Sequence, residues 1–238
     1  MAFRLDNIVP WGRSFDEYVR MFGLTSDELA LSILSCGDGP AGFNSEMNKR
    51  GNKVISCDPI YQFTAEQLQM RIKESYETVM TEAYKNKDNF VWDIIKSPEE
   101  LGRVRMEAME GFLADFKKGK QEGRYLVESL PSLPFEDKAF DLALCSHFLF
   151  LYTEQLSLEF HRASIAEMCR VANEVRIFPL IDMDLKGSRY VDIIRTKFTE
   201  AGYSVEIKTV PYEFQRDGNE MMKIRGKING ELNDLSIS

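Results

Sequence analysis

The order of apolar runs and amphipathic stretches along the chain predicts alternating strands and helices. Runs rich in aliphatic residues are typical of buried strands, and five occur in order: LSILSC (31–36), KVISCD (53–58), YLVES (125–129), FDLALCS (140–146) and EVRIFPL (174–180). Apolar residues recurring every three or four positions predict helices over 43–51 and 156–171, between these runs, and over 188–202, after the fifth run. This alternation is typical of a mostly parallel sheet with helices on both faces.

Two strand-like runs close the pattern, YSVEIKTV (203–210) and EMMKIRGK (220–227), separated by a short polar segment. The short connection predicts an antiparallel pair at one edge of the sheet. We therefore predict an α/β fold in one domain, 1–238. Its sheet is doubly wound, mostly parallel and seven-stranded, with an antiparallel C-terminal edge.

Other helices are predicted from their capping patterns. Ser14 with Glu17 three positions later begins a short N-terminal helix. More than 60 residues separate KVISCD from YLVES, far more than one crossover needs. Within this interval, Thr64 with Gln67 begins one amphipathic helix, and the segment from Ser97 begins a second. We interpret 61–123 as a helical insertion after the second strand.

Charge and composition narrow the class of partner. The 238 residues carry a net charge of −8, which disfavours a protein that binds nucleic-acid phosphates. No segment approaches the ~18 apolar residues of a membrane span, and the start of the chain lacks a signal-peptide core. We expect a cytoplasmic protein with no membrane or nucleic-acid partner and leave its oligomeric state open. The four dispersed cysteines are expected to be reduced packing residues, and no metal site is predicted.

A glycine-rich segment, GDGPAG (37–42), lies between the first strand and the following helix. Glycines there let the backbone approach a nucleotide and leave helix N–H groups free. Asp58 ends the second strand, where a carboxylate can accept both hydroxyls of a ribose. Both features fit a dinucleotide as well as S-adenosylmethionine (AdoMet). The alternative is a tight turn followed by a solvated aspartate.

The segment VESLPSLPFEDKAFDLALCSH (127–147) favours AdoMet. With VISCDP (54–59) and the closing strand pair, it resembles the class I AdoMet-dependent methyltransferases, over about 30–58 and 124–227. The resemblance implies that the two glycines lie under methionine and ribose, that the aspartate binds the ribose, and that later residues meet the adenine and the sulfonium. The cofactor-binding residues implied in this way are Gly37, Gly39, Asp58, Pro59, Ser129, Leu130, Cys145 and Ser146.

The chain departs from the family pattern at two positions. Ser35 stands where the family commonly has an acid that contacts the methionine amino group, and Asp38 is the candidate replacement. Ser129 stands in place of the usual adenine-contacting aspartate, with Glu128 beside it as an alternative.

His147, just past the fourth strand, is the candidate catalytic base, because substrate-side groups often lie there in such enzymes. The alternative is a hydrogen-bonded histidine with no role in catalysis. His161, mid-helix among charged residues, is predicted to lie at the surface or at an edge, and no role is assigned to it. Arg13 and Tyr18 precede the first strand and are candidates for binding the methionine carboxylate. Packing of this segment, including Trp11, is the alternative.

The insertion is nearly neutral, with 10 Lys and Arg against 12 Asp and Glu. Because it follows Asp58 directly, we expect it to cover the cofactor and shape an acceptor pocket, as a possible lid. A brace or a dimer surface is the alternative. The candidate lining residues within it are Tyr61, Trp92, Arg103 and Arg105.

These observations together predict an AdoMet-dependent methyltransferase acting on a small or medium acceptor whose identity stays open. One alternative is a nicotinamide-dependent oxidoreductase that uses GDGPAG as a dinucleotide turn. Another is a noncatalytic AdoMet-binding or interaction protein, suggested by Ser35 and by the lack of a second obvious base.

Overall fold

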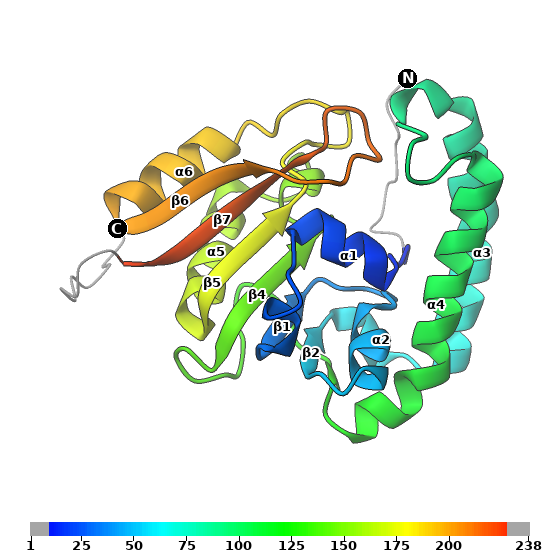
Figure 1. Ribbon diagram of the computed structural model, residues 1–238, viewed down its shortest axis with the longest axis horizontal. Coiled ribbons are helices and arrows are strands. Elements are labelled where there is room, and N and C mark those ends of the chain that lie inside the picture. The colour runs from blue at the N-terminus through cyan, green and yellow to red at the C-terminus, as the bar shows by residue number, and fades with distance from the viewer. Residues whose placement is uncertain (1–9, 228–238) are drawn as a thin grey trace.

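The computed structural model describes residues 10–227, in which seven strands form one sheet (Figure 1). The spatial order is β3-β2-β1-β4-β5-β7-β6, parallel from β3 to β5, with β7 antiparallel to both of its neighbours. The predicted α/β fold with an antiparallel C-terminal edge is therefore confirmed. The strands are β1 (Ile33–Cys36), β2 (Val54–Cys57), β3 (Tyr125–Leu126), β4 (Phe140–Ser146), β5 (Ala172–Phe178), β6 (Tyr203–Thr209) and β7 (Glu220–Lys227).

The register of the central strands brings three predicted site segments to one edge. Cys36, the last residue of β1, pairs with Cys57 of β2 on one side and Cys145 of β4 on the other. Parallel strands in this register end at the same level, so the residues that follow them meet there. Strand β3 is shorter than predicted, with two paired residues.

Helices cover both faces of the sheet. They are α1 (Phe15–Phe22), α2 (Phe43–Lys49), α5 (Leu158–Val171) and α6 (Val191–Glu200). The predicted capping box at Ser14 and Glu17 is present, with the Ser14 side chain accepting from Glu17 N and the Glu17 carboxylate accepting from Ser14 N. None of the helices described between residues 10 and 227 is long and apolar enough to cross a membrane.

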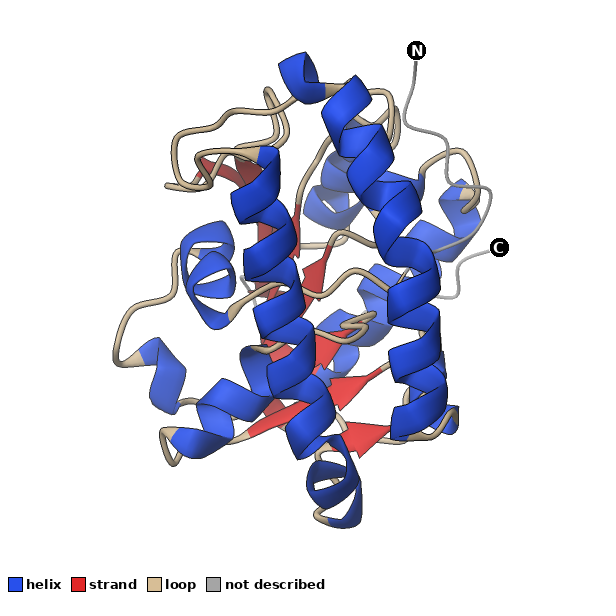
Figure 2. Cartoon of the chain, turned by 90° about the vertical axis from the view of Figure 1, so that its right-hand side faces the viewer, coloured by secondary structure: helices blue, strands red, loops and turns tan. Residues whose placement is uncertain are grey.

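The insertion consists mainly of two long helices, α3 (Ala65–Lys85) and α4 (Pro98–Gln121), which lie side by side beyond α2 (Figure 2). Their N-termini are where the capping patterns predicted, at Thr64 and Ser97. Helix α4 contacts α2 and β3. Four aromatic residues pack between the insertion and the sheet edge: Tyr61, Phe112, Phe116 and Tyr125. The insertion is therefore joined to the sheet by a core of its own.

The prediction that His161 lies at the surface or at an edge is wrong, because this residue of α5 is fully buried. Its ring nitrogens lie 2.8 Å from the Ser157 carbonyl oxygen and 2.9 Å from that of Leu149. Ile165 and Met168 follow on the same helical face and pack on the sheet. The charged neighbours that suggested exposure belong to the other faces of this helix.

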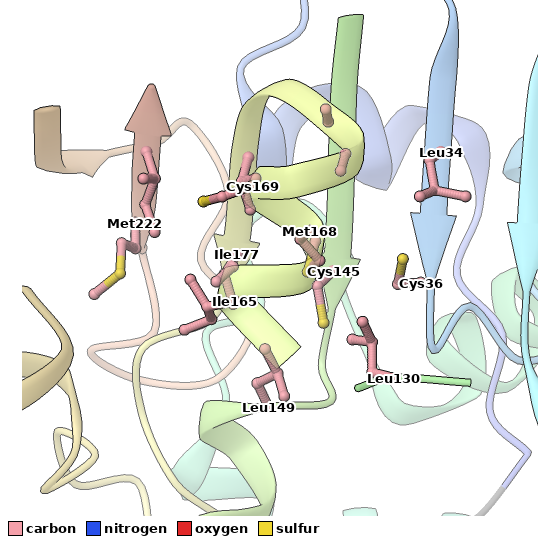
Figure 3. Close-up of a cluster of buried hydrophobic side chains, with 14 of the residues drawn as sticks. Leu34, Cys36, Leu130, Cys145, Leu149, Ile165, Met168, Cys169, Ile177 and Met222 are labelled. Carbon is pink, nitrogen blue, oxygen red and sulfur yellow. The ribbon is translucent and has the colours of Figure 1, made fainter. Parts of the chain in front are cut away.

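All four cysteines are buried, as expected of packing residues. Cys36, Cys145 and Cys169 belong to the core cluster between the sheet and α5 (Figure 3). Cys145, predicted to line the sulfonium side of the site, lies in this core instead. A strand covered on both faces presents alternate residues to opposite sides, and the neighbouring Ser146 is the residue that faces the cavity described next.

Candidate active site

A cavity of about 320 Å³ lies beyond the carboxyl ends of β1, β2 and β4. This is the edge at which open α/β sheets bind their ligands, and the volume is within the range of small-molecule sites. The structure brings eleven of the twelve predicted site residues to its lining, and Cys145 is the exception. Those eleven are Arg13, Tyr18, Gly37, Asp38, Gly39, Asp58, Pro59, Ser129, Leu130, Ser146 and His147.

The glycine turn adopts a backbone that other residues rarely take. Gly37 and Gly39 have φ angles of +65° and +57°, in the left-handed region that favours glycine. A Cβ on Gly37 would lie 3.0 Å from the Phe148 ring, whereas a Cβ on Gly39 would meet no atom within 4 Å. Gly39 therefore leaves open space at the cavity wall.

Asp58 connects this turn to the start of the insertion. Its Oδ2 accepts a hydrogen bond from Gly39 N and its Oδ1 one from Ile60 N, each at 2.9 Å. Burial raises the pKa of Asp58 to about 6, with the negative charge of Asp38 adding to the rise and the two hydrogen bonds opposing it. The carboxylate thus has a structural role that a solvated strand-end aspartate would lack, and it faces the cavity at the same time.

Asp38 is bound by three hydroxyl groups under the glycine turn. Oδ1 accepts from Tyr18 and, at 2.6 Å, from Ser35, and Oδ2 accepts from Ser56 at 2.6 Å. Burial raises the pKa of Asp38, and the three hydrogen bonds oppose the rise. Ser35, where the family commonly has an acid, therefore helps hold an acid three residues later. The Tyr18 hydroxyl, predicted to meet the methionine carboxylate, is directed to Asp38 instead.

The segment before α1 lies directly on the glycine turn. The Arg13 carbonyl accepts from Gly42 N at 2.9 Å, and a Cβ on Gly12 would lie 2.1 Å from the Pro40 oxygen. The Arg13 guanidinium donates to the Trp11 carbonyl at 2.8 Å, and its buried Nε has no hydrogen-bond partner. Burial lowers the pKa of Arg13 to about 10, and the nearby positive charge of Arg105 adds to this effect.

Arg105 of α4 is buried beside Arg13 and pairs with Glu17 of α1. The other Glu17 oxygen accepts from Tyr212 at 2.7 Å. Burial alone would raise the pKa of Glu17, but Arg105 and these hydrogen bonds bring it to about 2. The ionised Glu17 carboxylate therefore pairs with Arg105, and its charge also acts on Arg13.

His147 is held in a defined orientation at the end of β4. Its φ is +51°, its N–H donates to the Phe178 carbonyl at 2.6 Å, and its Nδ1 lies 2.9 Å from Ser146 Oγ. Ser146 can donate to the Met21 sulfur at 4.0 Å, which leaves its oxygen free to accept from a protonated Nδ1. In that tautomer Nε2 carries the lone pair. Burial, with the charges of Arg13 and Arg105, lowers the pKa of His147 well below 6.5, so the ring is neutral at pH 7.

Among the insertion residues predicted to line an acceptor pocket, Arg105 alone faces the cavity. Tyr61 is buried in the aromatic core and donates to the Gly39 carbonyl at 2.8 Å. Trp92 packs against Phe214, and Arg103 is exposed, paired with acidic residues of its own helix. These three predictions of lining residues are wrong.

Other lining residues could not be selected from the sequence. The lining residues of α3 and α4 belong to the apolar stripes that predicted these helices. The spacing of such a stripe does not show which of its side chains pack in the core and which line a cavity. The loop residues carry no motif at all. The additional lining residues include Val79, Ala83, Asn89, Phe90, Leu101, Phe148, Leu151, Tyr152, Met183, Leu185, Phe214 and Gln215.

The strand order, the reversed β7 and a ligand cavity at the carboxyl edge define a Rossmann-like fold of the class I methyltransferase type. No family model matches the chain. The chain belongs to the family of the uncharacterized protein MJ0045 of Methanocaldococcus jannaschii. The two are 33% identical over 224 residues, which cover 93% of this chain and 97% of that protein.

Solved structures with a similar arrangement include magnesium protoporphyrin IX methyltransferase from Synechocystis PCC 6803 with bound SAM. Its TM-score is 0.44 at 12% identity, over 89% of this chain and 90% of that one. A putative RNA methyltransferase from Pyrococcus horikoshii has a TM-score of 0.43 at 13% identity, over 86% of this chain and 78% of that one. Similarities of this size assign no activity.

Proposed function

We propose that the chain is an AdoMet-dependent methyltransferase acting on a small or medium-sized acceptor. The observation that carries this proposal is the cavity in which the glycine turn, Asp38 and Asp58 meet. Two carboxylates beside the turn suit a cofactor with a net positive charge. They would repel the diphosphate of a nicotinamide dinucleotide, which is placed over the same kind of turn.

The residues present fit AdoMet. Each Asp58 oxygen accepts one backbone N–H and keeps a further lone pair for a ribose hydroxyl. Asp38 supplies negative charge for the methionine ammonium group, and Ser129 with Leu130 would contact the adenine. When bound, AdoMet supplies an electrophilic methyl group, so the chain need only position the acceptor and exclude water. The cavity volume of about 320 Å³ and the net charge of −8 favour a small acceptor over nucleic acid.

Calorimetric titration tests this assignment. AdoMet is expected to bind and NADH is not, whereas binding of NADH alone would overturn the proposal. Transfer of labelled methyl from AdoMet to a small molecule in cell extract would then exclude a noncatalytic AdoMet-binding protein.

His147 is proposed as the base that accepts the acceptor's proton, through the Nε2 lone pair. Because its pKa is lowered, we expect the ring to stay neutral on acidification until well below pH 6.5. The sequence has two histidines, so NMR of the imidazole nitrogens gives two ring systems, and His147→Gln assigns them. A His147 midpoint at or above 6.5 would contradict the proposed environment.

AdoMet affinity is expected to fall on acidification, because ribose binding needs the ionised Asp58 carboxylate. With a pKa of about 6, roughly one tenth of Asp58 is ionised at pH 5, which predicts about tenfold weaker binding than at pH 7.5. Unfolding does not explain such a loss. A carboxyl whose folded pKa is raised stabilises the fold most below its unfolded pKa, and this contribution disappears as pH rises through 6. Asp58→Asn should remove the slope, and a slope that persists would assign it to Asp38.

We propose the insertion as a lid over the acceptor, supported by Val79, Ala83 and Leu101 in the cavity wall. A lid opens, so amides of α3 and α4 are expected to exchange hydrogen faster than those of β4 without ligand, and more slowly with AdoMet. Hydrogen-exchange mass spectrometry measures both states. Equal protection in the two states would favour a brace, joined through the aromatic core around Tyr61.

A further inference from the structure

The cavity lining carries charges of both signs. Asp38 and Asp58 stand at the glycine turn, and the charge of Asp38 acts on Asp58. Arg13 and Arg105 also line the cavity, and their charges are the ones that act on His147. The two carboxylates suit cationic AdoMet. The two arginines are left for the second ligand.

The two arginines carry more positive charge than the one carboxylate beside them offsets. Glu17 faces Arg105 and is already occupied by that ion pair and by hydrogen bonds from Ser14 and Tyr212. Arg13 donates to a neutral carbonyl, that of Trp11. Arg13 is half-buried, and a partly desolvated guanidinium paired with a neutral group alone gains a strong interaction from a ligand that supplies negative charge beside it.

Both arginines also keep a buried donor without a partner. Arg13 Nε and Arg105 Nε are two of three side-chain polar atoms in residues 10–227 that are buried and have no hydrogen-bond partner. Arg105 is 1% exposed and lines the cavity. Buried donors in native proteins are nearly always satisfied. The unsatisfied Nε donors of two arginines that line one cavity therefore point to a hydrogen-bond acceptor that arrives with a ligand.

Much of the remaining lining is apolar. These walls come from α3 and α4, through Val79, Ala83 and Leu101, and from the loops that carry Phe90 and Phe214. The rings of Phe90 and Phe214 stack with centroids 4.8 Å apart. An apolar or aromatic body fits such walls, and the charged or titratable groups available to recognise its polar part are the two arginines and His147.

We propose that the methyl acceptor is a small molecule with an apolar or aromatic body and an anionic group, such as a carboxylate, that binds Arg13 and Arg105. This inference rests on the proposed function and names the class of its substrate. The proposal assigns the anionic group bound by the arginines to the acceptor. The alternative is that Arg13 binds the methionine carboxylate of the cofactor.

The test uses three probes of similar size on the full chain saturated with S-adenosylhomocysteine: phenylacetate, phenylacetamide and phenethylamine. Ligand-observed NMR should detect phenylacetate binding, the neutral amide about tenfold or more weaker, and no binding of the amine. Equal binding of the three probes would overturn the inference. Calorimetry with S-adenosylhomocysteine alone is the separate test of the cofactor site, and failure there overturns both proposals.

Variants identify which arginine produces the preference for the anionic probe. Arg13→Gln should remove the preference for phenylacetate over phenylacetamide, and Arg103→Gln, an exposed position on α4, should retain it. Arg105→Gln alone would leave Glu17 buried without its partner, so the double change Glu17→Gln with Arg105→Gln is used. A preference that survives in both the Arg13 variant and this double variant would contradict the inference.

A last competition experiment distinguishes the two carboxylates that the arginines could bind, that of the acceptor and that of the cofactor's methionine. If phenylacetate is displaced by S-adenosylhomocysteine but not by its decarboxylated analogue, the arginines bind the methionine carboxylate and the acceptor assignment is wrong. Simultaneous binding of phenylacetate and S-adenosylhomocysteine supports the acceptor.

Discussion

Gly39→Asn is expected to abolish AdoMet binding, with an affinity loss of about 100-fold or more, while the protein stays folded. Asparagine tolerates the left-handed conformation better than other side chains, and Gly39 has a φ of +57°. The added side chain would meet no protein atom within 4 Å of its Cβ, so it would occupy the cavity next to Asp58. Titration calorimetry measures the affinity and circular dichroism the fold.

Gly123→Asn is the matched control for this change. Gly123 also has a positive φ, +73°, and open space around a Cβ, but it lies after α4 and away from the cavity lining. It should keep AdoMet affinity at the parental value. Unchanged affinity in the Gly39 variant would mean that the cofactor does not lie on the turn.

The fold could be predicted to the level of single elements because its signals are local. The capping patterns at Ser14, Thr64 and Ser97 each depend on residues within one helical turn, and all three begin helices where predicted. The closing strands were also recognised, since β6 and β7 are adjacent in the chain. The predicted exposure of His161 was wrong, because the exposure of a helical residue depends on which helical face meets the sheet. The charged residues near His161 indicated the wrong face.

Residues that come at or just after strand ends, such as Gly37, Asp58 and His147, could be predicted to lie around one cavity, because parallel strands in register end at the same edge. The site was not predictable where contacts join distant segments. The ion pair between Glu17 and Arg105 spans 88 positions, and the hydrogen bond between Glu17 and Tyr212 spans 195. Neither pairing has a spacing that a sequence pattern can display. These contacts position Arg105, one of the two cavity arginines that suggest the acceptor class.

Asp58→Ala is expected to have two separable effects, one on affinity and one on stability. Loss of charge-assisted hydrogen bonds to ribose, at about 1.5 to 3 kcal/mol, predicts AdoMet binding about 10- to 150-fold weaker. The apo protein should also lose about 1 kcal/mol or slightly more in free energy of unfolding. The carboxylate caps the Pro59–Gln62 turn through Ile60 N and holds Gly39 N, and a lost aspartate cap costs about that amount.

Denaturant unfolding without ligand and calorimetry with AdoMet measure the two effects independently. Asp141→Ala serves as the comparison for the structural part. Asp141 accepts from Ser32 N and Oγ at the opposite end of the sheet, so its loss should lower stability without altering affinity. If Asp58→Ala behaves in the same way, the carboxylate is a structural cap alone. Nucleoside binding would then rest on the glycine turn, and the Gly39→Asn result would decide it.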